Sequence, residues 1–506
     1  MTCSRQLTVI DLGSNSFRLV VFAASSDWWK RVDEIYEPVR IGEGLAASGR
    51  LGARPMARAL KALDVFAHFC HTNGLSGDSV DAVATSAIRE ASNSAEFLAR
   101  VREQTGLHVR VLTREQEARY GYIAAVNSTT LDEGCVLDLG GGSVQLVRVD
   151  ARRAREGGSW PLGAVRMTER FLTGKGPAKP RQLDALRAHV AEQLESSDWL
   201  SAAGKRLVGL GGSVRALAAA AQRVKGASTS GVQGTVIERE TLEDLVLRLA
   251  ALPANERSRI PGIKPVRADL ILAAAVVVQA IFDIGGFDTI EATEAGLREG
   301  IFFEHYLDAE NPLVADVRYS SVRNLAARYD IDPAHTQHVT ELALSMFDQL
   351  AQLGLHAGDA RERELLWAAC ELHDIGMSID YDQHHKHSRY LILSGGLPGF
   401  SPSEVAIVSQ AARYHRKGMP TPGPMQQLLR GADMRVLDRC AVLLRLAEDL
   451  ERSRDQLVRE ALFSSSDGGV QLRLVSDGQA QVARWAASRE RELFARAFDR
   501  ELAVLD

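Results

Sequence analysis

The stretch that decides the fold is Cys135-Val136-Leu137-Asp138-Leu139-Gly140-Gly141-Gly142-Ser143-Val144-Gln145-Leu146-Val147. An apolar run ends at an aspartate, three glycines and a serine follow, and a second apolar run begins at once. This pattern predicts two strands joined by a tight hairpin, in which glycine permits positive φ angles and lets backbone N–H groups approach a ligand. Such N–H groups bind anions, and a carboxylate at the strand end can hold a hard metal ion. An ordinary hairpin without a ligand would show the same local pattern.

A second copy of the pattern lies near the N-terminus, in Asp11-Leu12-Gly13-Ser14-Asn15-Ser16-Phe17-Arg18-Leu19-Val20. The aspartates of the two copies, Asp11 and Asp138, are 127 positions apart. Self-similarity at this distance predicts two copies of one domain rather than an array of short repeats. Two facing domains with one phosphate-binding hairpin each would form a cleft for a phosphate chain.

Length and composition predict a soluble protein of three or four domains. The chain has 506 residues, of which 45% are hydrophobic and 25% charged, and its formal net charge is −5. This charge argues against a general nucleic-acid-binding protein. The five cysteines are scattered and predict reduced thiols in the cytoplasm. We expect no membrane span, because the most apolar window, Leu270 to Ile284, is typical of a core helix.

The order of strand and helix patterns predicts four segments. Strands alternate with helices over residues 1–125 and again over residues 126–308, as in α/β domains. The second segment has another glycine turn, Gly211-Gly212-Ser213, at the start of a helix, where N–H groups and the helix dipole favour phosphate. Residues 309–460 have long helical patterns and most of the histidines, and residues 461–506 form a small α+β tail with one strand and one helix.

Several motifs together resemble the exopolyphosphatase/guanosine pentaphosphate phosphatase (Ppx/GppA) family. They are Asp11-Leu-Gly-Ser-Asn-Ser-Phe-Arg-Leu, Ala84-Thr85-Ser86-Ala87-Ile88-Arg89, Glu115-Gln116-Glu117-Ala118-Arg119, Asp138-Leu-Gly-Gly-Gly-Ser, Gly209 to Arg215, Arg267-Ala268-Asp269 and Ala295-Gly296-Leu297-Arg298-Glu299-Gly300. The resemblance covers residues 1 to about 305. It implies an actin-like/sugar-kinase fold of two ribonuclease-H-like domains, Mg²⁺-dependent removal of terminal phosphate, and a homodimer. The histidine-rich segment resembles the helical HD-like domain of longer, exopolyphosphatase-type members.

The resemblance also implies roles for individual residues. Glu117 would take the proton from the attacking water, and Arg89 would bind the terminal phosphate. Asp138, with Asp11 nearby, would hold Mg²⁺. Three groups of residues would cradle phosphates, namely Gly13, Ser14, Asn15 and Ser16; Gly140, Gly141, Gly142 and Ser143; and Gly211, Gly212 and Ser213.

The chain departs from the family at one metal position. The family pattern is Gly-Gly-Gly-Ser-Thr-Glu, whereas this chain has Val144-Gln145 in place of Thr-Glu. Gln145 keeps an oxygen that can bind metal but lacks the charge. We therefore expect weaker metal binding, or a substrate other than long-chain polyphosphate.

The helical segment has residues in the order of an HD metal site. They are His335, His373-Asp374 and Asp449, whose imidazole and carboxylate groups suit a second divalent metal ion. The alternative is a purely structural segment in which these side chains make polar contacts.

Three functions remain open from the sequence. The first is an exopolyphosphatase that releases orthophosphate from inorganic polyphosphate, favoured by the length and the HD-like segment. The second is a guanosine pentaphosphate (pppGpp) phosphatase. The third is a sensor that binds polyphosphate or (p)ppGpp with little turnover, which Gln145 keeps open.

Overall fold

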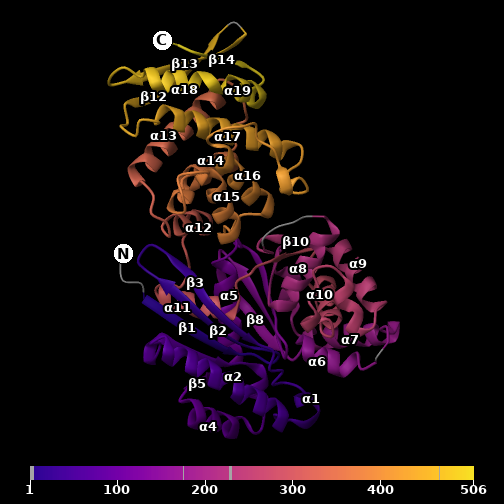
Figure 1. Cartoon of the computed structure of the whole chain (residues 1–506). Coiled ribbons are helices and arrows are strands. Elements are labelled where there is room, and N and C mark those ends of the chain that lie inside the picture. The colour runs from indigo at the N-terminus through magenta and orange to yellow at the C-terminus, as the bar shows by residue number, and fades with distance from the viewer. Residues whose placement is uncertain (1–4, 175, 227–230, 467, 506) are drawn as a thin grey trace. The chain divides into compact units, whose positions relative to one another are not determined.

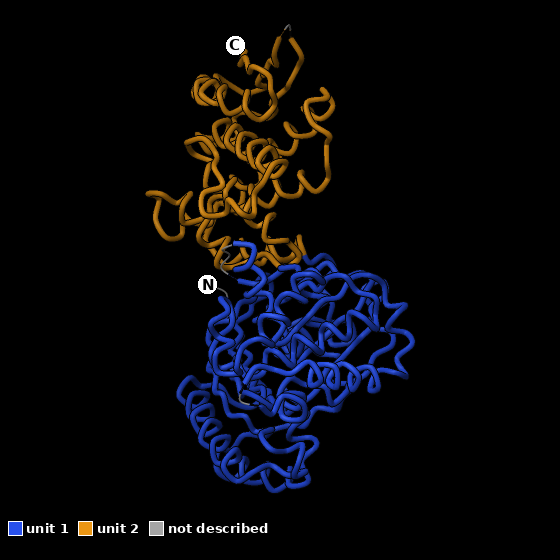
Figure 2. The backbone as a smooth tube through the Cα atoms, turned by 90° about the vertical axis from the view of Figure 1, so that its right-hand side faces the viewer, with its two compact units in different colours: residues 1–226, 231–317 blue, residues 227–230, 318–506 orange. Residues whose placement is uncertain are grey.

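The chain forms two compact units in the computed structural model, which describes residues 5–174, 176–226, 231–466 and 468–505. Figure 2 colours the first unit, which ends at Val317, and the second unit, which begins at Arg318. Residues 308–316 belong to the first unit because Asn127 Nδ2 donates to the Pro312 carbonyl at 2.7 Å and Arg152 Nη1 donates to the Ala315 carbonyl at 2.6 Å. The boundary between the units therefore lies later than the position 308 expected from the sequence.

The N-terminal half of the first unit is built on a five-stranded sheet (Figure 1). Its strands are β1 (Arg5–Leu12), β2 (Phe17–Ala24), β3 (Trp29–Glu37), β4 (Val80–Ala84) and β5 (Val109–Val111). The helices of this half are α1 (Leu45–Ser48), α2 (Ala53–Thr72), α3 (Ser86–Glu90) and α4 (Ser94–Thr105). One face of the sheet packs on the apolar sides of α2 and α4, where Phe66 and Phe97 are fully buried.

The second half repeats this architecture in a six-stranded sheet. Its strands are β6 (Gly134–Leu139), β7 (Val144–Asp150), β8 (Arg153–Trp160), β9 (Leu207–Leu210), β10 (Thr235–Glu238) and β11 (Thr289–Ala292). The order β8-β7-β6-β9-β11 reproduces the order β3-β2-β1-β4-β5 of the first sheet, and β10 is added at the edge. In the hairpins, Asp11 pairs with Arg18 and Asp138 pairs with Gln145, so even the register is the same. The predicted duplication is confirmed.

Helices α5 (Arg114–Val126) and α11 (Leu297–Tyr306) connect the two sheets. Their apolar residues share one core with strands of both sheets, including Val9 of β1 and Val136 of β6. Phe302 of α11 stacks on Phe22 of β2 with 4.5 Å between the ring centroids. The two halves of the first unit are therefore joined by a continuous hydrophobic core.

The outer face of the second sheet is covered by helices. They are α6 (Ala164–Phe171), α7 (Pro180–Leu194), α8 (Gly212–Val224), α9 (Arg239–Ala250) and α10 (Ile271–Gly285). Helix α10 is buried along almost its whole length, which confirms the predicted core helix. None of the described helices is long and apolar enough to cross a membrane.

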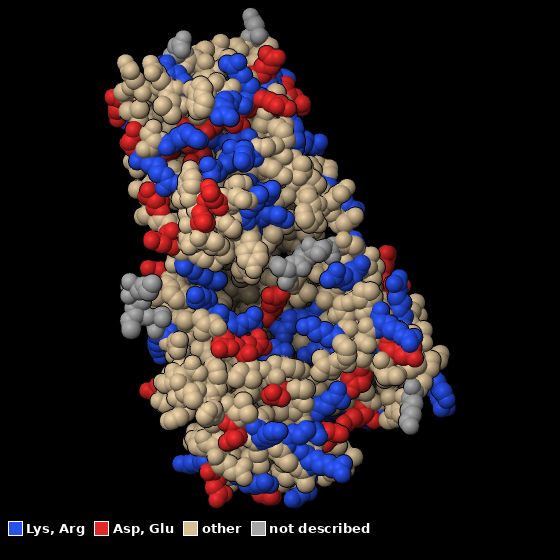
Figure 3. Space-filling view, in the orientation of Figure 1, with Lys and Arg blue, Asp and Glu red and all other residues tan. Residues whose placement is uncertain are grey.

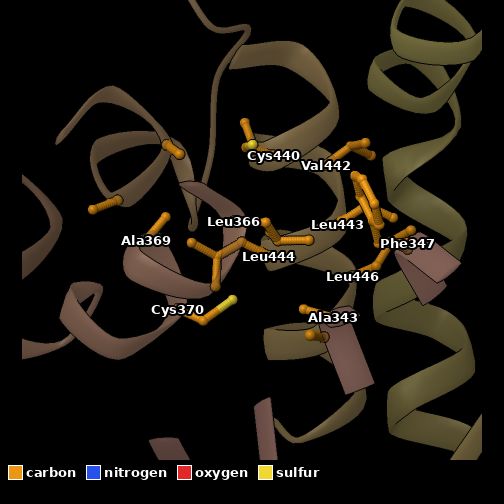
Figure 4. Close-up of a cluster of buried hydrophobic side chains, with 14 of the residues drawn as sticks. Ala343, Phe347, Leu366, Ala369, Cys370, Cys440, Val442, Leu443, Leu444 and Leu446 are labelled. Carbon is orange, nitrogen blue, oxygen red and sulfur yellow. The ribbon is translucent and has the colours of Figure 1, made fainter. Parts of the chain in front are cut away.

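The second unit is mainly helical. Its larger helices are α12 (Val317–Ala326), α13 (Pro333–Gln352), α14 (Ala360–Leu372), α15 (His384–Gly395), α16 (Pro402–Tyr414) and α17 (Ala432–Leu450). Figure 4 shows part of their core, in which Phe347 of α13, Cys370 of α14 and Leu443 of α17 are buried among other apolar side chains. On the face drawn in Figure 3, basic and acidic side chains are interspersed, in keeping with the small net charge.

The C-terminal part of the second unit contains more elements than the sequence predicts. A three-stranded sheet consists of β12 (Val458–Ser466), β13 (Gly469–Ser476) and β14 (Glu501–Val504), with helices α18 (Gln481–Ala487) and α19 (Arg491–Phe498). The single helix expected from Gln481 to Ala503 is wrong, because Asp499 adopts a left-handed conformation (φ 53°) that ends α19 before β14. Leu472 of this sheet is buried in the same core as the helices.

Candidate active site

The two glycine hairpins of the first unit lie against each other. A Cβ atom on Gly141 would lie 3.3 Å from the backbone nitrogen of Asn15, and one on Gly142 would lie 2.5 Å from Ser86 Oγ. Gly140, Gly141 and Gly142 do not use the positive φ angles that glycine permits. A side chain at Gly142 would displace the hydroxyl groups of Ser86 and of Ser14 in the facing hairpin.

Neighbouring segments hold the carbonyl groups of both turns. The contacts are Arg40 N to Asn15 O at 2.8 Å, Gly42 N to Ser14 O at 3.0 Å, Ala164 N to Gly140 O at 3.0 Å and Val165 N to Gly141 O at 2.9 Å. In a trans peptide the N–H points opposite to the C=O. The N–H groups of Asn15, Ser16, Gly141 and Gly142 therefore point away from these supporting contacts and remain free to face an anion.

The hairpins border a cavity of about 140 Å³. The residues predicted from the sequence that line it are Asp11, Gly13, Ser14, Asn15, Ser16, Glu117, Asp138, Gly140, Gly141, Ser143, Gln145, Gly211, Gly212 and Ser213. Two predicted residues, Gly142 and Arg89, are not among its described lining residues. The structure thus collects carboxylates and three glycine turns from distant parts of the chain around one space.

Glu117 lies in the first turn of α5, whose N-terminus is capped by Thr113 and Gln116. Its side chain is buried, with Oε2 at 2.9 Å from Arg89 Nη1 and Oε1 at 3.4 Å from Ser143 Oγ. Burial raises the pKa of this carboxyl to about 7, although the Arg89 guanidinium opposes the rise. The group can therefore exchange a proton near neutral pH.

Arg89, which is predicted to bind the terminal phosphate, contacts Glu117 in the structure. Its Nη1 donates to the carbonyl of Leu112 at 2.8 Å and to Glu117 at 2.9 Å. It lies beside Glu117 and outside the described cavity lining. Its Nε and Nη2 are buried without a hydrogen-bond partner among the described residues, and its binding of the terminal phosphate stays a prediction.

Asp11 and Asp138 stand at the equivalent ends of β1 and β6. Burial raises the pKa of Asp138 to about 6, and the nearby Asp11 charge adds to the rise. Burial also raises the pKa of Asp11, whose Oδ1 is buried without a hydrogen-bond partner among the described residues. Two mutually repelling carboxylates, one with an unpaired buried oxygen, fit a hard divalent cation such as Mg²⁺.

Gln145 faces the same cavity from β7 and connects to Glu117 through a hydroxyl. Its Nε2 donates to Ser143 Oγ at 2.9 Å and to Ser159 Oγ at 3.0 Å, while Ser143 Oγ donates to Glu117. In the repeat, Arg18 occupies the position equivalent to Gln145. The two copies therefore present different groups to the cavity from the same site in the fold.

Four arginines that the sequence analysis did not assign also line the cavity, namely Arg18, Arg215, Arg267 and Arg298. Burial and the neighbouring cations Arg298 and Arg215 lower the pKa of Arg18 to about 10. The pKa values of Arg215 and Arg267 are also lowered, mainly by burial. Clustered cations in a recess are stabilised by a bound polyanion. In the sequence, these four arginines all lie within the motifs quoted above, and that position could have identified them as candidate phosphate-binding residues.

The predicted residues of the HD-like segment form a second cluster, within the second unit. His335 Nε2 and His373 Nε2 lie 3.4 and 2.9 Å from Glu448 Oε1, and Asp374 lies beside them. The prediction of Asp449 is corrected to Glu448. Successive residues of a helix point about 100° apart, and Asp449 instead lies 3.6 Å from Arg452.

Sequence models of known families match both units. A model described as the Ppx/GppA phosphatase family matches residues 20–309, and one described as Ppx/GppA phosphatase, domain III, matches residues 317–487.

Several solved structures are similar to part of this chain. The Ppx/GppA family member of Aquifex aeolicus is 30% identical over 61% of this chain and 100% of its own, with a TM-score of 0.52. An exopolyphosphatase-like protein is 27% identical over 59% of this chain and 96% of its own, with a TM-score of 0.54. An exopolyphosphatase from Cytophaga hutchinsonii, 21% identical over 61% and 100%, has a TM-score of 0.56 and shows a shared fold.

Proposed function

Because the chain belongs to the Ppx/GppA phosphatase family, we propose that it is an exopolyphosphatase, which hydrolyses the terminal phosphoanhydride bond of inorganic polyphosphate and releases orthophosphate. The first unit has the actin-like α/β fold of this family, and a helical region follows it. The observation that carries the proposal is the cavity in which four arginines and three glycine turns surround the carboxylates of Glu117, Asp11 and Asp138.

In the proposed mechanism, the protein binds the phosphate chain through backbone and arginine donors. The N–H groups of Asn15, Ser16 and Gly141 and the start of α8 at Gly212 are oriented before substrate arrives. Preorganised dipoles stabilise the charge that spreads over the phosphoryl oxygens in the transition state. The arginines neutralise the remaining charge of the chain.

Asp11 and Asp138 would hold Mg²⁺, with Gln145 nearby. The ion would supply charge neutralisation at the transferred phosphoryl group. Such a cation would also offset the cost of burying the two carboxylates, since burial is the main cause of their raised pKa values.

Glu117 is the proposed general base. Arg89 and Ser143 hold its two oxygens in place, and its pKa of about 7 is suited to accepting a proton from water at neutral pH. The proton would remain on Glu117 until the orthophosphate leaves and solvent enters the cavity.

The lining of the cavity supports polyphosphate over pppGpp as substrate. Among the described lining residues there is no aromatic side chain, and the apolar ones are Leu139, Ala164, Leu270 and Leu297. Recognition of a guanine base usually includes stacking or an apolar pocket. A pppGpp phosphatase remains the second candidate, on the basis of the family alone.

The test is phosphate release from long-chain polyphosphate and from pppGpp in the presence of Mg²⁺. We expect faster release from polyphosphate and a loss of about 10²–10⁴-fold in Glu117→Gln. Glu115→Gln is the matched control, because Glu115 is exposed on the same helix. Faster release from pppGpp would move the assignment to the second candidate, and tight binding of both without turnover would indicate a sensor.

A further inference from the structure

Six side chains of the second unit converge in a buried cluster that the proposed phosphatase site does not use. Three lie on helices α13, α15 and α17, namely His335, His384 and Glu448. The other three directly follow α14 and α16, namely His373, Asp374 and His415. Five of them are at least nine-tenths buried, and Glu448 is partly exposed. The ligand atoms form two overlapping groups, within each of which all atoms lie within 4.8 Å of one another.

Backbone contacts fix the tautomers of three of the histidines. The contacts are His373 Nδ1 to Cys370 O at 2.6 Å, His384 Nδ1 to Tyr381 O at 2.9 Å and His415 Nδ1 to Ala412 O at 2.7 Å. A carbonyl oxygen only accepts, so each Nδ1 carries the hydrogen. In the neutral imidazoles each Nε2 then carries a free lone pair. This arrangement is common in histidines that bind metal ions.

These Nε2 atoms point at other electron-rich atoms. His384 Nε2 and His415 Nε2 are 3.0 Å apart. His373 Nε2 is 2.9 Å from Glu448 Oε1 but lacks the geometry of a hydrogen bond, and Asp374 Oδ1 is buried without a hydrogen-bond partner among the described residues. Several lone pairs directed at one buried space repel one another unless protons or metal cations lie between them.

Asp374 lies between the two groups and faces each with a different oxygen. Its Oδ1 is 3.3 Å from His384 Nε2 and 3.9 Å from His415 Nε2. Its Oδ2 is 3.9 Å from His335 Nε2 and 3.8 Å from His373 Nε2. Arg454 Nη2 also donates to Oδ2 at 2.9 Å and orients this carboxylate. A carboxylate placed in this way can bridge two ions.

We propose that the second unit contains a centre of two divalent transition-metal ions bridged by Asp374. One ion is bound by His335, His373, Asp374 and Glu448, and the other by Asp374, His384 and His415. Four imidazoles and two carboxylates favour Mn²⁺, Fe²⁺, Co²⁺ or Zn²⁺ over Mg²⁺. The two units of the chain would therefore select different classes of metal, since the first offers carboxylate oxygens and the second offers imidazole nitrogens.

The test uses the full-length protein, stripped with a chelator and loaded with Co²⁺ in excess Mg²⁺. We expect two retained Co²⁺ ions per chain by elemental analysis, with visible absorption bands characteristic of nitrogen ligation. His384→Gln should retain one ion, and Asp374→Asn should retain none. The absorption spectrum of the unmodified protein keeps the test valid even if a variant fails to fold.

Asp449→Asn is the matched control for Glu448→Gln, because the two carboxylates are adjacent on α17 but only Glu448 faces the histidines. Glu448→Gln should lower retention of Co²⁺, whereas Asp449→Asn should retain both ions. Asp138→Asn in the first unit should also leave the count unchanged. The proposal is overturned if the unmodified protein retains no Co²⁺ in excess Mg²⁺, or if its bound Co²⁺ lacks nitrogen ligands.

Discussion

At the scale of single residues, the chemistry of the cavity depends on how Glu117 is surrounded. Water is largely excluded from its carboxyl, and Arg89 and Ser143 contact its two oxygens. Burial raises the pKa and the Arg89 charge lowers it, so the value of about 7 is a balance of two opposing effects. Either effect can be changed by one substitution.

The balance predicts a pH dependence. If Glu117 acts as a base, kcat/KM should rise with pH along a limb near pH 7, because only the carboxylate accepts a proton. Arg89→Gln should move this limb to higher pH, since loss of the cation removes an interaction that favours the carboxylate. The measurement is a pH profile of phosphate release. Arg119 lies on the same helix as Glu117 and pairs with Glu304 of α11, so Arg119→Gln is the control and should leave the limb in place.

Gln145 predicts how strongly the first unit binds metal. Gln145→Glu would add a negative charge opposite Asp138 and should lower the Mg²⁺ concentration needed for half-maximal activity. Val144→Thr restores the other family residue without a charge and should change this concentration little. An unchanged Mg²⁺ requirement in Gln145→Glu would place the ion away from this residue.

At the scale of elements, the site depends on turns that approach each other closely. Each hairpin joins two strands, its carbonyl groups are held from one side, and its N–H groups remain available on the other. The third turn leads into α8 through Gly211, which has φ 95°, a conformation that favours glycine. Three separate turns thus contribute donors to one cavity.

Gly142 tests the close approach of the hairpins. In Gly142→Ala, the added Cβ would lie 2.5 Å from Ser86 Oγ and 2.8 Å from Ser14 Oγ, so these two hydroxyls, which bond to each other at 3.0 Å, must move. We expect the free energy of unfolding to fall by about 1–3 kcal/mol in urea titrations, together with a loss of phosphate release. Gly174→Ala is the control, because nothing lies within 4 Å of a Cβ there. Equal activity in both variants would contradict the close packing.

At the scale of the whole molecule, the active-site residues are brought together by the core between the two sheets. Glu117 lies on α5 and Arg298 lies on α11, and both helices pack in that core. The second unit has a core of its own and a separate cluster of potential metal ligands. The chain therefore combines two independently built sites.

Gly300 tests the contact between α5 and α11. A Cβ on Gly300 would lie 2.0 Å from the backbone carbonyl oxygen of Tyr120, which cannot move without shifting α5. Gly300→Ala should therefore lower the melting temperature more than Gly142→Ala and reduce phosphate release, because Glu117 and Arg298 would separate. Unchanged thermal unfolding and activity would show that the helices can adjust at no cost. Gly174→Ala again serves as the control.

The sequence by itself determined the features that depend on local patterns. Glycines between apolar runs define the hairpins, the repeat of Asp11 at Asp138 defines the duplication, and motif order defines the family. These signals are readable because turn geometry and strand alternation depend on neighbours in the chain.

Only the tertiary structure decided which residues meet. Arg89 reaches Glu117 from another helix, the cavity arginines come from both halves, and Glu448 rather than Asp449 faces the histidines. The C-terminal β14 forms because β13 is available as a parallel partner. Such contacts depend on helix phase, packing and burial between segments distant in the chain, and no local pattern encodes them.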